Sequence, residues 1–114
     1  MAEYLVQVGY TAEAWAAMIR EPQNRLELVA PAAESLGGKF KEAWISFGEY
    51  DLVGIIEMPD NVAAAAFSIG VTSKGAVRAL KTTPLLSMDQ SVEAMGRAQR
   101  LAYTPPTKSP AAVS

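Results

Sequence analysis

The order in which strand-like and helix-like segments alternate constrains the fold of this chain more than any other feature. Runs of β-branched and aromatic residues with a period of two predict strands, and apolar residues spaced by three and four predict helices. The sequence therefore predicts the order β-α-β-β-α-β, followed by one more helix. The predicted strands cover residues 4–10, 39–47, 52–58 and about 76–83, and the predicted helical stretches cover 12–20, 24–36, 61–73 and 88–101.

Capping residues mark the starts of the predicted helices, because short polar side chains satisfy the free backbone N–H groups there. The candidate caps are Thr11, Asn24, Asp60 and Ser87. Pro31 lies inside the second helical stretch, where we expect a kink or a local break. In the Ala-rich helix we expect Val62, Ala66 (or Ala65) and Ile69 on the buried side.

The predicted order is that of the split β-α-β unit, so the expected fold class is α+β, a ferredoxin-like βαββαβ sandwich with an extra C-terminal helix. Right-handed crossovers place both main helices on one face of a four-stranded antiparallel sheet, with the first and third strands at its centre. We expect one domain at residues 1–102. Residues 103–114 hold three of the seven prolines and read as a Pro-rich flexible tail.

The helix-free face of this sheet is too apolar to face water in a monomer. A wetted face alternates apolar and polar residues, yet the strand at 52–58 is apolar on both sides except at Glu57. In the second strand we expect Phe40 and Trp44 on one side and Ala43, Ile45 and Phe47 on the other. Large apolar patches mark interfaces, and we therefore expect a homodimer or higher oligomer. The alternative is that the C-terminal helix folds back over this face.

Composition excludes several kinds of chemistry. The chain has no cysteine and no histidine, which removes disulfides, thiolate nucleophiles, structural zinc, His-ligated haem or iron, and a His general base. We expect no metal and no cofactor. A net charge of −2 is a poor match for nucleic acid. The sequence shows neither a secretory signal nor a membrane-spanning apolar run, and we expect a cytoplasmic protein that does not bind membranes.

The segment Gly48-Glu49-Tyr50-Asp51 follows Trp44-Ile45-Ser46-Phe47, and further distinctive segments are Tyr10-Thr11, residues 32–39, Pro59-Asp60-Asn61 and Gly75-Ala76-Val77-Arg78. In this order along the chain, these segments resemble the GYD-domain family of small bacterial and archaeal proteins. The resemblance implies a dimeric α+β barrel, shared with antibiotic-biosynthesis-type monooxygenases and muconolactone-isomerase-like proteins. It implies no particular activity. Pro31 and the tail after Leu101 depart from the family pattern.

Aromatic and turn residues are the first candidates for a binding site. Tyr10 and Trp44, with Trp15, can line a pocket for a planar apolar ligand, although such residues more commonly belong to the core. Tyr50 and Asp51 offer a phenol and a carboxylate in a turn. The alternative is that Asp51 only hydrogen-bonds its own backbone.

Charged residues on the strands are the second candidates. Arg78 can bind a carboxylate with two parallel hydrogen bonds. Lys81 lies on the opposite face of a regular strand and joins the same site only if a bulge intervenes. Glu42 can act as a general acid or base if a dimer encloses it, and the alternative is an ion pair with Arg78. No histidine is present to activate Ser46, Thr82 or Thr83.

These observations predict a small homo-oligomeric protein that binds a small apolar or aromatic carboxylate in an inter-sheet cavity. Any catalysis is expected to be cofactor-free, of the isomerase or oxygenase type. The alternative is a non-catalytic assembly module whose apolar sheet face serves only to oligomerise.

Overall fold

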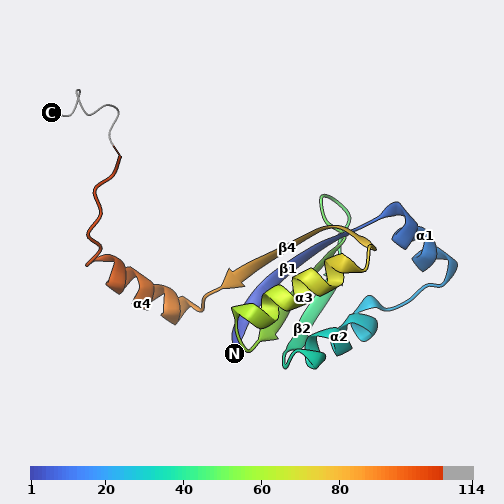
Figure 1. Cartoon of the computed structure of the whole chain (residues 1–114), viewed down its shortest axis with the longest axis horizontal. Coiled ribbons are helices and arrows are strands. Elements are labelled where there is room, and N and C mark those ends of the chain that lie inside the picture. Colours follow the sequence, from blue (N-terminus) through green and yellow to red (C-terminus); the bar gives the residue numbers. More distant parts are fainter. Residues whose placement is uncertain (107–114) are drawn as a thin grey trace.

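The structure is a computed structural model and describes residues 1–106. One antiparallel sheet in the order β2-β3-β1-β4 carries α2 and α3 on the same face (Figure 1). This confirms the predicted α+β, ferredoxin-like arrangement with the first and third strands at its centre. The elements are β1 (Ala2–Tyr10), α1 (Ala12–Arg20), α2 (Arg25–Ser35), β2 (Lys39–Ile45), β3 (Leu52–Met58), α3 (Asn61–Ser73), β4 (Val77–Leu85) and α4 (Met88–Ala98).

The helices start where the capping residues predict. The side chains of the four predicted caps accept backbone hydrogen bonds from the first turns, and Ser87 and Gln90 form a complete capping box. The local break that we expected as one outcome at Pro31 is absent, since α2 continues through this residue to Ser35. Pro31 is exposed, and a proline inside a helix removes one of its backbone hydrogen bonds. α2 ends at Ser35, and the chain turns away two residues later at Gly37, whose φ of 82° is in the left-handed region that glycine adopts readily.

The core lies between the sheet and the helices α2 and α3. Alternate residues of β1 and β3 point toward the helices and are fully buried, with Tyr4, Val6, Ile56 and Met58 the largest of them. Ala64 and Phe67 of α3 cover this layer together with Ala33 of α2. The predicted buried side of α3 is wrong, since Val62, Ala65, Ala66 and Ile69 are exposed. α3 is apolar on nearly every side, so the spacing of its residues does not identify the buried one.

A β-bulge in β2 changes which of its side chains share a face. Phe40 pairs with Ile56 and Glu42 pairs with Ile55, so Lys41 is the extra residue. Phe40 packs edge-on against Phe67 of α3, with ring centroids 5.9 Å apart. The expectation that Phe40 and Trp44 point the same way is therefore wrong. The bulge shifts the alternation by one residue and places Trp44, beside Val53, on the open face of the sheet.

The C-terminal part of the described chain leaves the sheet. β4 runs through Pro84 to Leu85, two residues beyond the predicted end, because a proline is tolerated in an edge strand. α4 then stands beyond the end of the sheet (Figure 1), so the C-terminal helix does not fold back over the open face. α4 ends at Ala98, earlier than predicted. Of the predicted tail, residues 103–106 have no helix or strand, and 107–114 lie outside the described residues.

Candidate functional site

An apolar cavity of about 240 Å³ lies between the helix-covered face of the sheet and the helices α2 and α3. An engineered cavity of about 150 Å³ with an apolar lining binds benzene, so the space suits one ring with a short substituent. The lining residues are Val6, Val8 and Tyr10 of β1, Phe40 of β2, Leu52 of β3, Arg25, Leu28, Val29 and Ala32 of α2, Phe67 and Val71 of α3, and Lys74, Ala76 and Val77.

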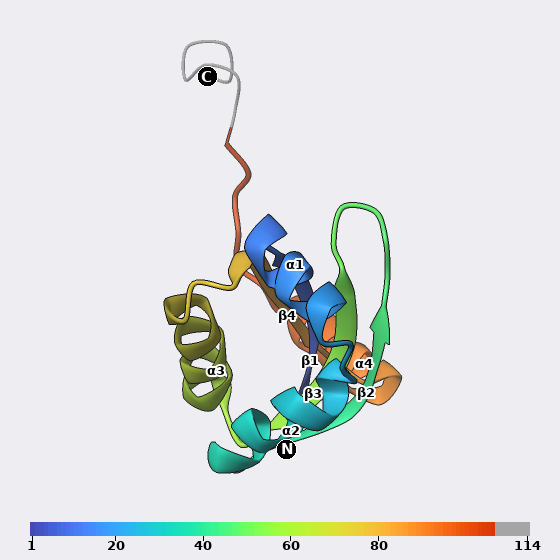
Figure 2. The same cartoon turned by 90° about the vertical axis from the view of Figure 1, so that its right-hand side faces the viewer.

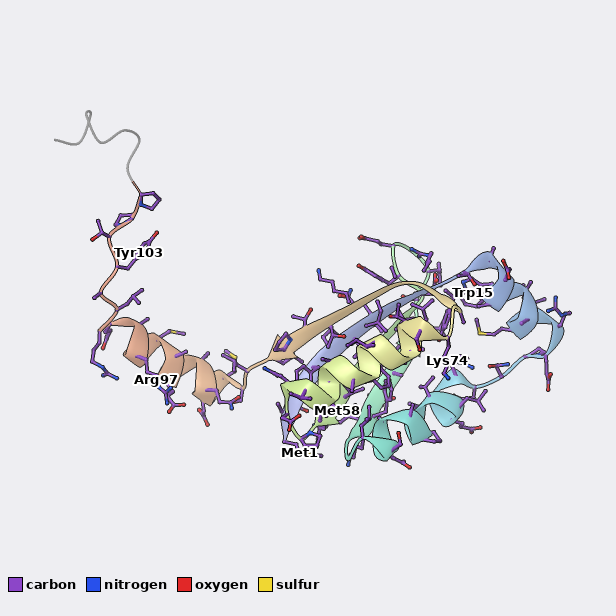
Figure 3. The ribbon with its side chains drawn as sticks, in the orientation of Figure 1. Met1, Trp15, Met58, Lys74, Arg97 and Tyr103 are labelled. Carbon is purple, nitrogen blue, oxygen red and sulfur yellow. The ribbon has the colours of Figure 1, made fainter. Side chains whose placement is uncertain are left out.

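Two cations border the cavity, and no acidic residue of the described chain lines it. Arg25 opens α2, and Lys74 follows the end of α3, on the side of that helix nearest to α2 (Figure 3). Positive charge at the rim of an apolar space favours a ligand that carries an anionic group on an apolar body.

Local structure holds the Arg25 side chain at this rim. The Asn24 side chain accepts a hydrogen bond from the backbone N–H of Leu26 at 3.0 Å, which fixes the first turn of α2. The Arg25 guanidinium lies 5.8 Å from the centroid of the Tyr10 ring, within cation–π range. Its Nη1 donates to Oε1 of Gln23 at 2.6 Å. The arginine is thus positioned from both sides before any ligand binds.

One donor of Arg25 is left over. Its Nε is buried and has no hydrogen-bond partner among the described residues. Leaving a buried donor unpaired costs about 1–3 kcal/mol, and more for a charged group. A carboxylate is the acceptor that suits a guanidinium best, since two parallel hydrogen bonds form between their planar groups. Arg25 therefore lines the cavity with one buried donor of its guanidinium unpaired.

The Asp51 side chain, in the loop between β2 and β3, contacts β1, α1 and β4. Its Oδ2 accepts from the backbone N–H of Tyr10 at 2.8 Å and from Nε1 of Trp15 at 3.3 Å, and it lies 3.7 Å from Nη2 of Arg78. The backbone of the same loop is fixed as well, since the Ser46 hydroxyl donates to the Tyr50 carbonyl at 2.8 Å. Asp51 thus anchors the β2–β3 loop to β1, α1 and β4. This supports the alternative in which Asp51 has a structural role in the turn. The backbone N–H that its carboxylate binds is that of Tyr10, however, and not one of the turn itself.

A second bulge places Arg78 on the open face. Gly9 pairs with Ala79 and Tyr10 pairs with Val77, which leaves Arg78 as the extra residue. Arg78 also donates from Nη2 to the backbone oxygen of Glu49 at 2.8 Å. Lys81 pairs with Gln7 on the same face. The bulge therefore brings Arg78 and Lys81 to one side of the sheet, which a regular strand does not allow.

Glu42 and Trp44 lie apart from these residues, on the edge strand β2. Glu42 is exposed, and its Oε1 accepts from the backbone N–H of Ala43 at 3.2 Å. β2 and β4 are opposite edges of the sheet, and Arg78 pairs with Asp51, so the alternative of a Glu42–Arg78 ion pair is wrong. Trp44 is on the open face and Tyr10 on the helix-covered face, and the two do not line one pocket within a chain.

A family model described as GYD domain matches residues 4–95. The chain belongs to the GYD domain family. Among solved structures, a chain titled "crystal structure of FFRP-DM1" is similar, with 18% sequence identity, a TM-score of 0.47, and coverage of 75% of this chain and 100% of that chain. No curated protein matches the sequence.

This GYD domain has no helix within residues 1–106 that is long and apolar enough to cross a membrane. In the same residues, no three acidic side chains gather in a way that could hold a metal ion. Of the predicted site residues, Tyr10 alone lines the apolar cavity. Tyr50 and Asp51 belong to the β2–β3 loop, and Arg78 contacts this loop at Asp51 and at the Glu49 carbonyl.

The local sequence patterns of this GYD domain do not identify Arg25 and Lys74 as site residues. Each stands at a helix end that the sequence does mark, Arg25 after the cap Asn24 and Lys74 before Gly75. The missing information is that the start of α2 and the end of α3 border the same cavity. That proximity depends on how the two helices pack on the sheet, which local patterns do not encode.

Proposed function

We propose that this GYD domain is a homo-oligomeric protein that binds a small apolar or aromatic carboxylate. The observation that carries the proposal is that Arg25, which lines an apolar cavity, has a buried Nε without a hydrogen-bond partner among the described residues. The ring or alkyl part of the ligand fills the space above Val6 and Val8. Its carboxylate accepts from Arg25, and the Lys74 ammonium adds to the positive potential.

The cavity on the helix side is a better site for this ligand than a space between two sheets. It is formed by one chain, and its lining is apolar except for Tyr10 and the two cations. No carboxylate of the described chain lines it, and Glu42 pairs with Ile55 on the opposite, open face of the sheet. We therefore propose binding as the function, while cofactor-free catalysis of the isomerase or oxygenase type stays a prediction.

The test is calorimetric titration with benzoate and with benzamide, which has a similar shape but no charge. Hydrogen bonds to charged groups contribute about 1.5–3 kcal/mol, so we expect benzoate to bind about tenfold to a hundredfold more tightly. Arg25→Met should remove most of this preference. Arg20→Met removes a charge of the same kind from the exposed end of α1 and should change nothing. Equal affinity for the two compounds, or no binding of either, contradicts the proposal.

A second candidate function is assembly through the open face of the sheet. Leu5 pairs with Ile55 and Gln7 with Val53 at its centre, and Trp44 beside Val53 is 55% exposed. No helix within residues 1–106 lies over this face of the sheet (Figure 1). Burying a large apolar side chain contributes about 1.5–3 kcal/mol, which favours packing of two such faces against each other.

Sedimentation velocity at micromolar concentration tests the second candidate. We expect at least a dimer for the natural chain and a monomer for Val53→Lys, with benzoate binding retained in both. Thr72→Lys, at an exposed position of α3, is the matched control and should stay oligomeric. A monomeric natural chain contradicts assembly and leaves the proposed ligand site standing.

A further inference from the structure

α4 is an arm that leaves the body of the protein. It lies past the end of β4 and outside the sheet (Figure 1). The radius of gyration is 19.3 Å, whereas a compact domain of this length has about 13 Å. The described chain by itself is therefore not compact, because α4 and the residues that follow it lie outside the sheet and the helices that cover it (Figure 1).

The arm carries an apolar stripe. Met88, Val92 and Met95 follow at the spacing of one helix face, and they are 82%, 66% and 63% exposed. The opposite face is polar, with Arg97 donating to Glu93 at 3.0 Å. Figure 3 shows Arg97 on α4, well apart from the sheet. α4 is thus amphipathic, and its apolar side faces water in the single chain.

A helix of this kind needs a partner. α4 has 11 residues, and isolated helices shorter than about 12–15 residues are marginal in water even with favourable sequences. The capping box at Ser87 and the Glu93–Arg97 pair support the helix locally. Most helical stability in proteins nevertheless comes from packing of the apolar side, and α4 has no buried residue among residues 1–106.

The root of the arm lies at the open face of the sheet. Ser87 and Gln90 border the same groove as Glu3, Lys41 and Glu57. The last three belong to the open face, where Glu3 pairs with Glu57 and Lys41 contacts both carboxylates. In the end-on view of Figure 2, α3 and α4 lie on opposite sides of β1. The arm therefore leaves on the side where the sheet itself lacks cover.

We propose that α4 packs its Met88, Val92 and Met95 stripe against a second copy of this chain, so that the α4 helix of each copy contacts the other copy. A dimer with two-fold symmetry then buries two apolar surfaces of each copy, the open face of the sheet and the stripe on α4. A membrane surface suits α4 less well. Lipid-binding helices are rich in Lys and Arg, whereas Asp89 and Glu93 here balance Arg97 and Arg100. This inference rests on the second candidate function, assembly through the open face.

A fluorescent label tests where the stripe is buried. The chain has no cysteine, so Val92→Cys carries an environment-sensitive dye at a single position. Ala94→Cys, on the other side of the same helix, is the control. We expect the emission at position 92 to shift to the blue as protein concentration rises through the range in which the oligomer forms, and the emission at 94 to stay constant. A concentration-independent blue shift, which indicates folding back onto the same chain, overturns the proposal, as does no shift at all.

Charge substitutions on the arm separate this inference from assembly itself. We expect Val92→Glu to raise the dissociation constant of the oligomer at least about tenfold, since it places a carboxylate in an apolar contact. Ala94→Glu should leave it unchanged. If Val92→Glu assembles as well as the natural chain, the arm contact is wrong while pairing of the sheets stands. A natural chain that is monomeric overturns both.

Discussion

The guanidinium of Arg78 occupies the space into which a side chain at Gly9 would project. A Cβ at position 9 would lie 2.6 Å from Cζ of Arg78. Because glycine leaves this space free, Arg78 crosses β1 and reaches both the Asp51 carboxylate and the Glu49 carbonyl. The glycine and the bulge at Arg78 together connect β4 to the β2–β3 loop.

This relationship predicts that Gly9 and Arg78 are energetically coupled. We expect Gly9→Ala and Arg78→Ala each to lower the free energy of unfolding by about 0.5–1 kcal/mol, a small loss because Arg78 is largely exposed. In the Arg78→Ala background, Gly9→Ala should cost almost nothing, since the contact that it displaces is already gone. Urea unfolding of the four proteins measures the coupling. Additive losses would show that the two residues act independently.

Gly38 is the glycine at which a side chain should do most harm to stability. A Cβ there would lie 2.2 Å from the backbone oxygen of Glu57, and backbone atoms cannot move aside cheaply. We expect Gly38→Ala to lower the free energy of unfolding by about 2–3 kcal/mol, the upper range for overpacking. Gly48 has no atom within 4 Å of such a Cβ, and Gly48→Ala should stay within about 0.5 kcal/mol of the natural chain. Equal urea midpoints for the two variants would contradict this packing.

Lys41 should titrate above its ordinary range. Its Nζ lies 2.6 Å from Oε2 of Glu3, and this hydrogen bond, with the charges of Glu3 and Glu57, raises the pKa of Lys41 above its ordinary value of 10.5. The raised pKa means that the pair stabilises the fold below about pH 10.5 and that this contribution is lost as the pH rises through the folded-state pKa. NMR titration of the lysine side chain measures it. Glu3→Gln should lower the pKa, whereas an unchanged value would exclude Glu3 as the main cause.

Filling the cavity should abolish ligand binding without unfolding the chain. Ala32 lines the cavity on α2, and we expect Ala32→Phe to place its ring in the space of the ligand. Ala66→Phe adds the same group at an exposed position of α3. Calorimetry with benzoate should show binding for Ala66→Phe and none for Ala32→Phe. Binding that survives in Ala32→Phe would place the ligand elsewhere.

Local patterns predicted the order of elements and the helix starts, because a cap such as Asn24 acts within one turn of its own position. They failed where the outcome depends on a neighbouring strand or helix. The bulges at Lys41 and Arg78 arise from pairing with β3 and β1, and each moved a side chain to the face opposite to the one predicted by regular alternation. The two cations at the rim of the cavity could not be predicted for the same reason, since Arg25 and Lys74 border one cavity only after α2 and α3 pack on the sheet.

The position of a bound carboxylate tests the account most directly. Intermolecular NOEs between the ring protons of benzoate and the methyl groups of the protein can be measured in solution. We predict NOEs to Val6 and Val71, which line the cavity under the helices. NOEs to Leu5 and Val53 on the open face of the sheet, or none to any methyl group under conditions in which benzoate binds, would contradict the proposed site.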